Sequence, residues 1–158
     1  MTTVTRQSGV VEGKYTETVY GYIRDQKYEE AINILSIELQ SFPRSRAALS
    51  LLGHCYYMLQ DYSNAVNMYE QLVKLFSEVE EYKIYYAQCL HKAGVYADAT
   101  RAALRVESEQ YTQRKTMLQA AIKYEQDDAR GCKAQCDKCI AEDPEVIVAY
   151  GCIAFKES

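Results

Sequence analysis

The sequence is poor in the residues that interrupt helices, with 2 Pro and 7 Gly among its 158 residues. It has no apolar run as long as a signal peptide or a membrane span. It also has no basic run, and its net charge is −4, whereas nucleic-acid binding needs a concentrated basic face. We therefore expect a globular chain of about one domain, placed in the cytoplasm, with no nucleic-acid partner and no membrane insertion.

Signatures of catalysis are missing as well. The sequence contains no glycine-rich phosphate loop and no metalloprotease motif. His54 next to Cys55, and His91 two places after Cys89, are its closest histidine and thiol neighbours. Side chains at i+1 or i+2 on a helix point in different directions. We therefore expect no catalytic residues and no cofactor, and a protein that is not an enzyme.

What is present is a short pattern that recurs at a period of about 34 residues, a length that indicates stacked pairs of helices. It reads KYEEAI at 27–32, DYSNAV at 61–66 and VYADAT at 95–100. We predict that each tyrosine opens the second helix of a pair and that the alanine three places later lies where two helices cross. These positions are Tyr28, Tyr62 and Tyr96, and Ala31, Ala65 and Ala99.

Small residues at the same spacing predict close approach in the first helices as well, at Gly53, Ala87 and Ala121. We expect Pro43 and Pro144 to close the first and fourth units, because proline cannot continue a helix. The fourth pair is predicted to have a turn one residue shorter than the others.

Six cysteines are present, and their spacing follows the repeat and the helix. Cys55 and Cys89 are separated by one period, and Cys132, Cys136 and Cys139 fall at i, i+4 and i+7, on one face of a helix. Because free cysteine packs as a small hydrophobic residue, we predict reduced packing cysteines and no metal site. The alternative is a thiol-based metal or redox protein built on the last three cysteines.

The period divides the chain into repeats. After a weakly ordered lead-in at 1–13, we expect repeats near 14–45, 46–79, 80–113 and 114–146 and a partial one at 147–158. The partial repeat ends without a polar capping helix, which predicts a piece of a longer array.

This pattern resembles the tetratricopeptide repeat, which has helix pairs of about 34 residues, small crossing residues and a terminal proline. The resemblance implies an all-α, right-handed superhelix, an α-solenoid of about four helix pairs plus the start of a fifth. In this family the first helices line the concave face, where peptides bind.

The residues predicted to line that groove are mostly aromatic and aliphatic. Charged clamps for an acidic peptide terminus need lysine, arginine and asparagine, and the matching positions instead include Thr16 and Glu81. We therefore expect an extended apolar or proline-rich ligand, although some of these side chains could instead pack between repeats. The groove residues are Tyr20, Leu51, His54, Tyr57, Ile84, Tyr85, Leu118 and Ile122, with Thr16 and Gln88 beside them.

A closer resemblance is carried by PRSRAALSLLG at 43–53, EEYKIYYAQ at 80–88 and LQAAIKYEQDD at 118–128. These stretches are similar to the tetratricopeptide-repeat subunits of intraflagellar transport complex B, the fleer type. The resemblance implies a ciliary scaffold that wraps a proline-rich hydrophobic segment of another core subunit. It also implies a link to axonemal tubulin polyglutamylation, a possible kinesin partner, and a location in the cilium or flagellum. A generic tetratricopeptide adaptor, similar to the cochaperones, is the alternative.

Overall fold

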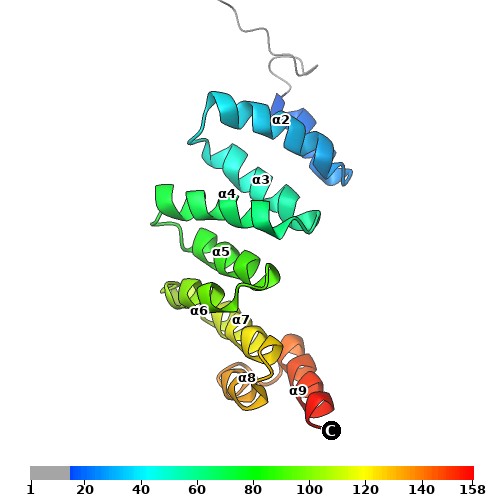
Figure 1. Cartoon of the computed structure of the whole chain (residues 1–158), viewed down its shortest axis with the longest axis vertical. Coiled ribbons are helices and arrows are strands. Elements are labelled where there is room, and N and C mark those ends of the chain that lie inside the picture. Colours follow the sequence, from blue (N-terminus) through cyan, green and yellow to red (C-terminus); the bar gives the residue numbers. More distant parts are fainter. Residues whose placement is uncertain (1–14) are drawn as a thin grey trace, which may run out of the picture. The chain divides into compact units, whose positions relative to one another are not determined.

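The computed structural model describes residues 15–158, and all regular structure within them is helical (Figure 1). The predicted lead-in at 1–13 lies outside the described residues. The helices are α1 Tyr15–Arg24, α2 Tyr28–Ser41, α3 Arg46–Met58, α4 Tyr62–Leu75, α5 Glu80–Lys92, α6 Tyr96–Leu104, the 3-10 turn η1 Glu109–Tyr111, α7 Thr112–Glu125, α8 Ala129–Cys136 and α9 Pro144–Glu157.

Four turns of equal length join the helices within the pairs, at 25–27, 59–61, 93–95 and 126–128. The middle residue of each turn has a left-handed backbone, with φ between 59° and 80°. In the first turn the Lys27 amide donates to the Tyr22 carbonyl at 2.8 Å, and the other three turns repeat this bond. This is the Schellman motif, which satisfies the last carbonyl groups of a helix and reverses the chain. The left-handed residues are Gln26, Gln60, Gly94 and Asp127.

The Tyr-x-x-Ala pattern falls where the sequence predicts. The helices α2, α4 and α6 begin at Tyr28, Tyr62 and Tyr96. The alanine three places into each of these helices is completely buried, at 0% exposure. In α8 the corresponding position is Cys132, which is 2% exposed. The small side chain at this position therefore lies in the interior in all four pairs.

The fourth pair differs from the prediction in its register. Its turn is not shorter than the others; instead, the interval between turns is one residue shorter from Gly94 to Asp127 than from Gln60 to Gly94. The position that Gly53 and Ala87 occupy is therefore filled by Ala120, which is 1% exposed, whereas the predicted Ala121 is half-buried. A single missing residue is enough to rotate every later side chain of α7 by about 100°.

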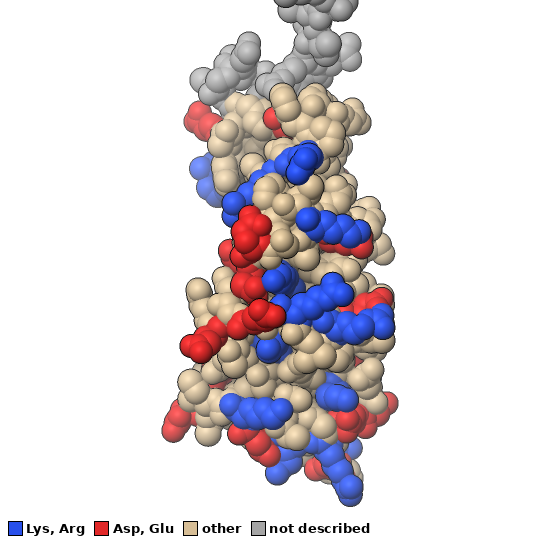
Figure 2. Space-filling model, turned by 90° about the vertical axis from the view of Figure 1, so that its left-hand side faces the viewer, with Lys and Arg blue, Asp and Glu red and all other residues tan. Residues whose placement is uncertain are grey.

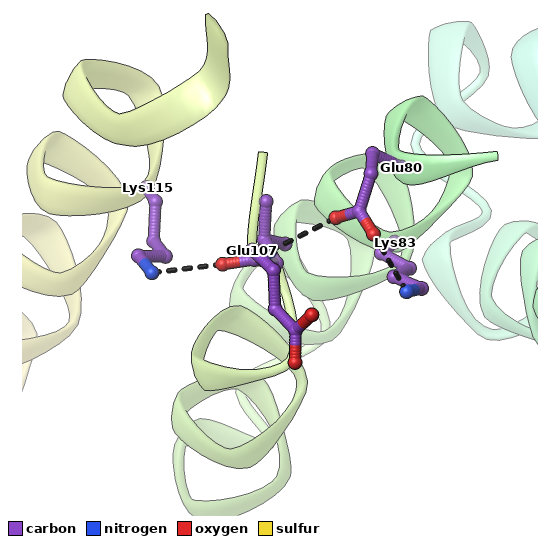
Figure 3. Close-up of polar contacts among 5 residues, drawn as sticks. Glu80, Lys83, Glu107 and Lys115 are labelled. Carbon is purple, nitrogen blue, oxygen red and sulfur yellow. Dashed lines mark hydrogen bonds and ion pairs between the residues drawn. The ribbon is translucent and has the colours of Figure 1, made fainter. Parts of the chain in front are cut away.

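The missing residue falls in the region where α6 ends early and an irregular segment leads to α7. Glu80 of α5 holds this segment, because its carboxylate accepts from the Glu107 amide at 3.0 Å and from Lys83 Nζ at 2.8 Å (Figure 3). From the other side, Lys115 Nζ donates to the Val106 carbonyl at 2.8 Å. Val106 itself is 1% exposed. These bonds hold the chain in place where α2 and α4, the corresponding helices of the first two pairs, continue as helix.

Two further details differ from the sequence prediction. Pro144 does not close the fourth unit but is the first residue of α9, where its missing N–H costs nothing. Pro43, in contrast, does lie in the turn after α2, at the end of the first unit. The helix α8 ends at Cys136. Cys139 therefore lies beyond the helix that was predicted to carry all three cysteines.

The chain divides into two compact units between Met68 and Tyr69. In the first unit α1, α2 and α3 enclose a core that includes Val19, Leu35 and Leu52. In the second unit α7, α8 and α9 enclose a core that includes Cys132, Cys136 and Ile153. Within residues 15–158, no helix is long and apolar enough to cross a membrane.

Candidate peptide-binding surface

The first unit has an open pocket of about 230 Å³ between α1, α2 and α3. Tyr20 and Leu51, both predicted groove residues, line it together with Thr16 and Ala47. Tyr20 is 55% exposed, which is high for an aromatic ring on a folded surface. Glu38 is the one charged side chain in the lining. This first pocket therefore offers mainly apolar surface.

The second unit has a larger pocket of about 480 Å³. It is bordered by α5, α7 and the start of α9, and its apolar part includes Ile84 and Leu118. Unlike the first pocket, it is surrounded by several polar and charged side chains. These are Gln88, His91, Lys92, Arg114 and Glu145.

The two pockets occupy equivalent places in the repeat pattern. Two periods along the chain, Thr16 of α1 corresponds to Ile84 of α5, and Tyr20 corresponds to Gln88. Once the missing residue before α7 is allowed for, Ala47 of α3 corresponds to Arg114 and Leu51 to Leu118. Every one of these residues lines one of the pockets. The two pockets therefore occupy equivalent positions in the repeat, and their linings differ in chemistry.

The predicted groove residues separate into accessible and buried ones. Tyr20 and His54 are exposed, whereas Ile84 and Ile122 are 2% and 1% exposed. Ile122 is buried because the shortened interval brings it to the position of Cys55 and Cys89. The remaining four residues are half-buried: Leu51, Tyr57, Tyr85 and Leu118.

Aromatic contacts hold three of these side chains in place. His54 packs edge-on against Tyr28, with ring centroids 6.3 Å apart, and Tyr57 packs edge-on against Tyr62 at 5.5 Å. Tyr85 is tilted against Tyr69 at 5.7 Å. Such fixed rings lose little conformational freedom when a ligand stacks on them.

Tyr85 contacts Arg114, a basic side chain in the lining of the second pocket. Its hydroxyl donates to Glu81 Oε1 at 2.6 Å, and the guanidinium of Arg114 lies 5.4 Å from its ring centroid. The hydrogen bond to Glu81 is the main reason that the pKa of Tyr85 is raised. Arg114 is also 6.0 Å from the ring centroid of Tyr111, so two aromatic faces orient its charge.

Burial lowers the pKa of His91, and Lys92 lowers it further, whereas Glu125 acts in the opposite direction. His91 is therefore neutral at pH 7 and available as a hydrogen-bond partner in the second pocket. Its ring lies 6.0 Å from that of Tyr96.

Sequence reasoning missed the four charged or histidine members of the second pocket: His91, Lys92, Arg114 and Glu145. His91 follows the predicted groove residue Tyr57 by one period, and Arg114 comes one place short of two periods after Ala47. The spacing of one period between Tyr57 and His91 is visible in the sequence, so His91 could have been predicted. Arg114 comes into register only once the shortened interval is known.

Four of the six cysteines are buried: Cys55, Cys89, Cys132 and Cys136, whereas Cys139 is half-buried and Cys152 is exposed. Cys55 and Cys89 are 0% and 1% exposed, and burial raises the pKa of their thiols to about 11 and about 12. They are therefore protonated and weakly reactive at neutral pH. In the described part of the chain, no three His, Cys, Asp or Glu side chains are grouped as metal ligands would be.

Comparison with known proteins gives a family match and close relatives. A sequence model of the family described as anaphase-promoting complex, cyclosome, subunit 3 matches residues 24–106. Intraflagellar transport protein 70A of Xenopus tropicalis is 47% identical over 94% of this chain. The protein of the same name from Danio rerio is 45% identical over 94%, and intraflagellar transport protein 70A1 of Mus musculus is 41% identical over 95%. The chain spans 23–24% of the length of these relatives.

Solved structures show the same fold at low sequence identity. The MamA RS-1 ArsTM double mutant superimposes with a TM-score of 0.77 at 19% identity, over 90% of this chain and 81% of that one. A thermophilic TPR protein of Thermus thermophilus gives 0.66 at 10% identity, over 90% and 79%. These likenesses confirm the predicted all-α tetratricopeptide-repeat fold.

Proposed function

We propose that the chain, which belongs to the tetratricopeptide-repeat family described as anaphase-promoting complex, cyclosome, subunit 3, is a scaffold of the intraflagellar transport B particle. Its similarity to intraflagellar transport 70 proteins supports this role. In this role it takes part in cilium assembly by binding a proline-rich hydrophobic segment of another core subunit. It acts through protein contacts and not through catalysis.

The first pocket is the observation that carries this proposal. Tyr20 and Leu51 present aromatic and aliphatic surface, with little charge beside them. A proline-rich segment is already extended, so it loses little entropy on binding and can stack its rings on aromatic side chains. Exposed apolar surface of this kind is typical of a protein-binding site.

The test is calorimetry with a synthetic proline-rich hydrophobic peptide, using the whole chain. We expect binding that changes little between low and high salt, because apolar contacts are not screened. Leu51→Glu should weaken the complex by at least tenfold, since the ligand would bury an unpaired carboxylate.

Leu104→Glu is the matched control. Leu104 is 62% exposed at the end of α6 and lines neither pocket, so this variant should bind as the parent does. Both variants should keep their helical circular dichroism. If Leu51→Glu binds the peptide with unchanged affinity, the first pocket is not the peptide site.

The family resemblance supports two finer proposals about partners. One is a kinesin motor that moves the particle, and the other is a link to polyglutamylation of axonemal tubulin, both in the cilium. Expression of a Leu51→Glu variant of the full-length protein in ciliated cells tests them. Loss of the glutamylated-tubulin signal, together with loss of kinesin co-precipitation, is the expected result.

A further inference from the structure

The two equivalent pockets differ most in their charge. Where the first pocket has Ala47, the second has Arg114, and Lys92 adds a second cation to its lining. Glu145 contributes one negative charge. With His91 uncharged at neutral pH, the lining of the second pocket contains two positive side chains and one negative one, whereas Glu38 is the one charged side chain in the lining of the first pocket.

Among residues 15–158, Lys92 and Arg114 take part in no ion pair within 4 Å. Arg114 reaches a carboxylate through Tyr85, which donates to Glu81. The ion pairs found there connect other residues, such as Lys83 with Glu80 and Lys123 with Asp128. Arg114 lies against aromatic rings, and Lys92 is exposed. On the face drawn in Figure 2, lysine and arginine side chains are numerous along the middle, and aspartate and glutamate side chains lie mostly toward its two sides.

We propose that the second pocket recognises an acidic side chain, aspartate or glutamate, within the extended proline-rich segment. This inference rests on the proposed function and adds a specificity to it. The carboxylate accepts charge-assisted hydrogen bonds from Lys92 and Arg114, while flanking apolar residues lie on Leu118 and Met117. Recognition of a chain terminus is not required, because the donors suit any carboxylate side chain.

Three synthetic peptides test this proposal by calorimetry at low and high salt. They share one proline-rich hydrophobic sequence and carry glutamate, glutamine or phosphoserine at one position. The glutamate peptide should bind about tenfold or more tightly than the glutamine peptide at low salt. That advantage should shrink at high salt, whereas the affinity of the glutamine peptide should stay nearly constant.

Variants assign the effect to the pocket. Lys92→Gln combined with Arg114→Gln should remove the preference for glutamate, measured as the ratio of the two affinities. Lys92→Gln alone should reduce this preference, and it is the safer variant because Lys92 is exposed. Glu145→Gln should enlarge the preference by removing a like charge. Lys138→Gln is the control, because Lys138 is an exposed lysine outside the pocket.

Equal affinity for the glutamate and glutamine peptides would overturn this inference and leave the proposed function intact. So would a preference that survives the Lys92 and Arg114 substitutions. Binding of the phosphoserine peptide alone would contradict both the inference and the proposed function. If none of the three peptides binds, both the proposed function and the inference are wrong.

Discussion

At the scale of single residues, volume at the buried repeat positions matters more than chemistry. Alanine fills this position in three helix pairs and cysteine in the fourth, and all four side chains are at most 2% exposed. Both are small and apolar, so a neighbouring backbone can come close. A larger side chain at such a position has no space to enter.

Ala65→Leu tests this requirement. Ala65 is 0% exposed, so the added methylene groups should lower the free energy of unfolding by about 1–3 kcal/mol. Ala97→Leu is the control, because Ala97 is exposed on α6 and the larger side chain can extend into solvent. Denaturant titration of both variants measures the difference. Equal stability of Ala65→Leu and the parent would show that Ala65 is not at a close helix crossing.

At the scale of helices and turns, the helix starts that recur once per period could be predicted from the sequence, whereas the shortened interval before α7 could not. The starts of α2, α4 and α6 follow from tyrosines that recur once in every period. The lost residue after Gly94 could not be located, because Met117 is followed by Leu118 and Ala120 by Ala121, so the apolar pattern of α7 fits either register. Ala121 and Ile122 were consequently assigned one position too far, and Arg114 was overlooked. The positions of the four left-handed turn residues in the structure show which interval is one residue shorter.

The left-handed residue of the third turn, Gly94, gives a prediction about stability. Gly94 has φ +80°, and a methyl group there would meet no neighbouring atom, so Gly94→Ala should destabilise only through the backbone, by about 1 kcal/mol. Gly151→Ala is the opposite case, since Gly151 lies within α9 with open space around it. It should stabilise by about 0.5–1 kcal/mol. If Gly94→Ala is as stable as the parent or more stable, turn geometry is not the reason for glycine at this position.

The segment before α7 gives a pH-dependent prediction. The hydrogen bond from Lys83, followed by the Glu107 amide, holds the pKa of Glu80 below its usual value. Glu80 therefore stabilises the fold above the unfolded-state pKa of about 4.3, and this contribution is lost as the pH falls through the lower folded-state pKa. Glu80→Gln should be less stable than the parent at pH 7, and the gap should narrow under acid.

Glu70→Gln provides the comparison for Glu80→Gln. Glu70 pairs with Lys74 at 3.1 Å, but its side chain is 42% exposed, against 23% for Glu80. An exposed pair of this kind contributes little, so Glu70→Gln should track the parent at every pH. Unfolding midpoints measured from pH 7 to pH 3 decide between the outcomes. A gap for Glu80→Gln that stays constant with pH would remove the carboxylate as its cause.

At the scale of the whole molecule, most contacts join neighbouring helices, so stability should be local. Repeat proteins behave approximately as a sum of repeat stabilities and nearest-neighbour terms. Each of the two units has a buried cluster of its own, one including Leu35 and the other Ile153. A defect in one cluster should therefore open the helices around it before the rest of the chain.

Hydrogen exchange of two core variants tests this locality. Leu35 and Ile153 are 1% and 3% exposed in different units, and truncation of either to alanine should cost about 2–5 kcal/mol. Leu35→Ala should speed amide exchange in α1, α2 and α3 and leave α7 to α9 almost unchanged. Ile153→Ala should do the reverse, because its cluster includes Cys132 and Cys136 of α8. Faster exchange in every helix of both variants would mean that the chain opens as one cooperative unit, since only a global transition carries a local loss to distant helices.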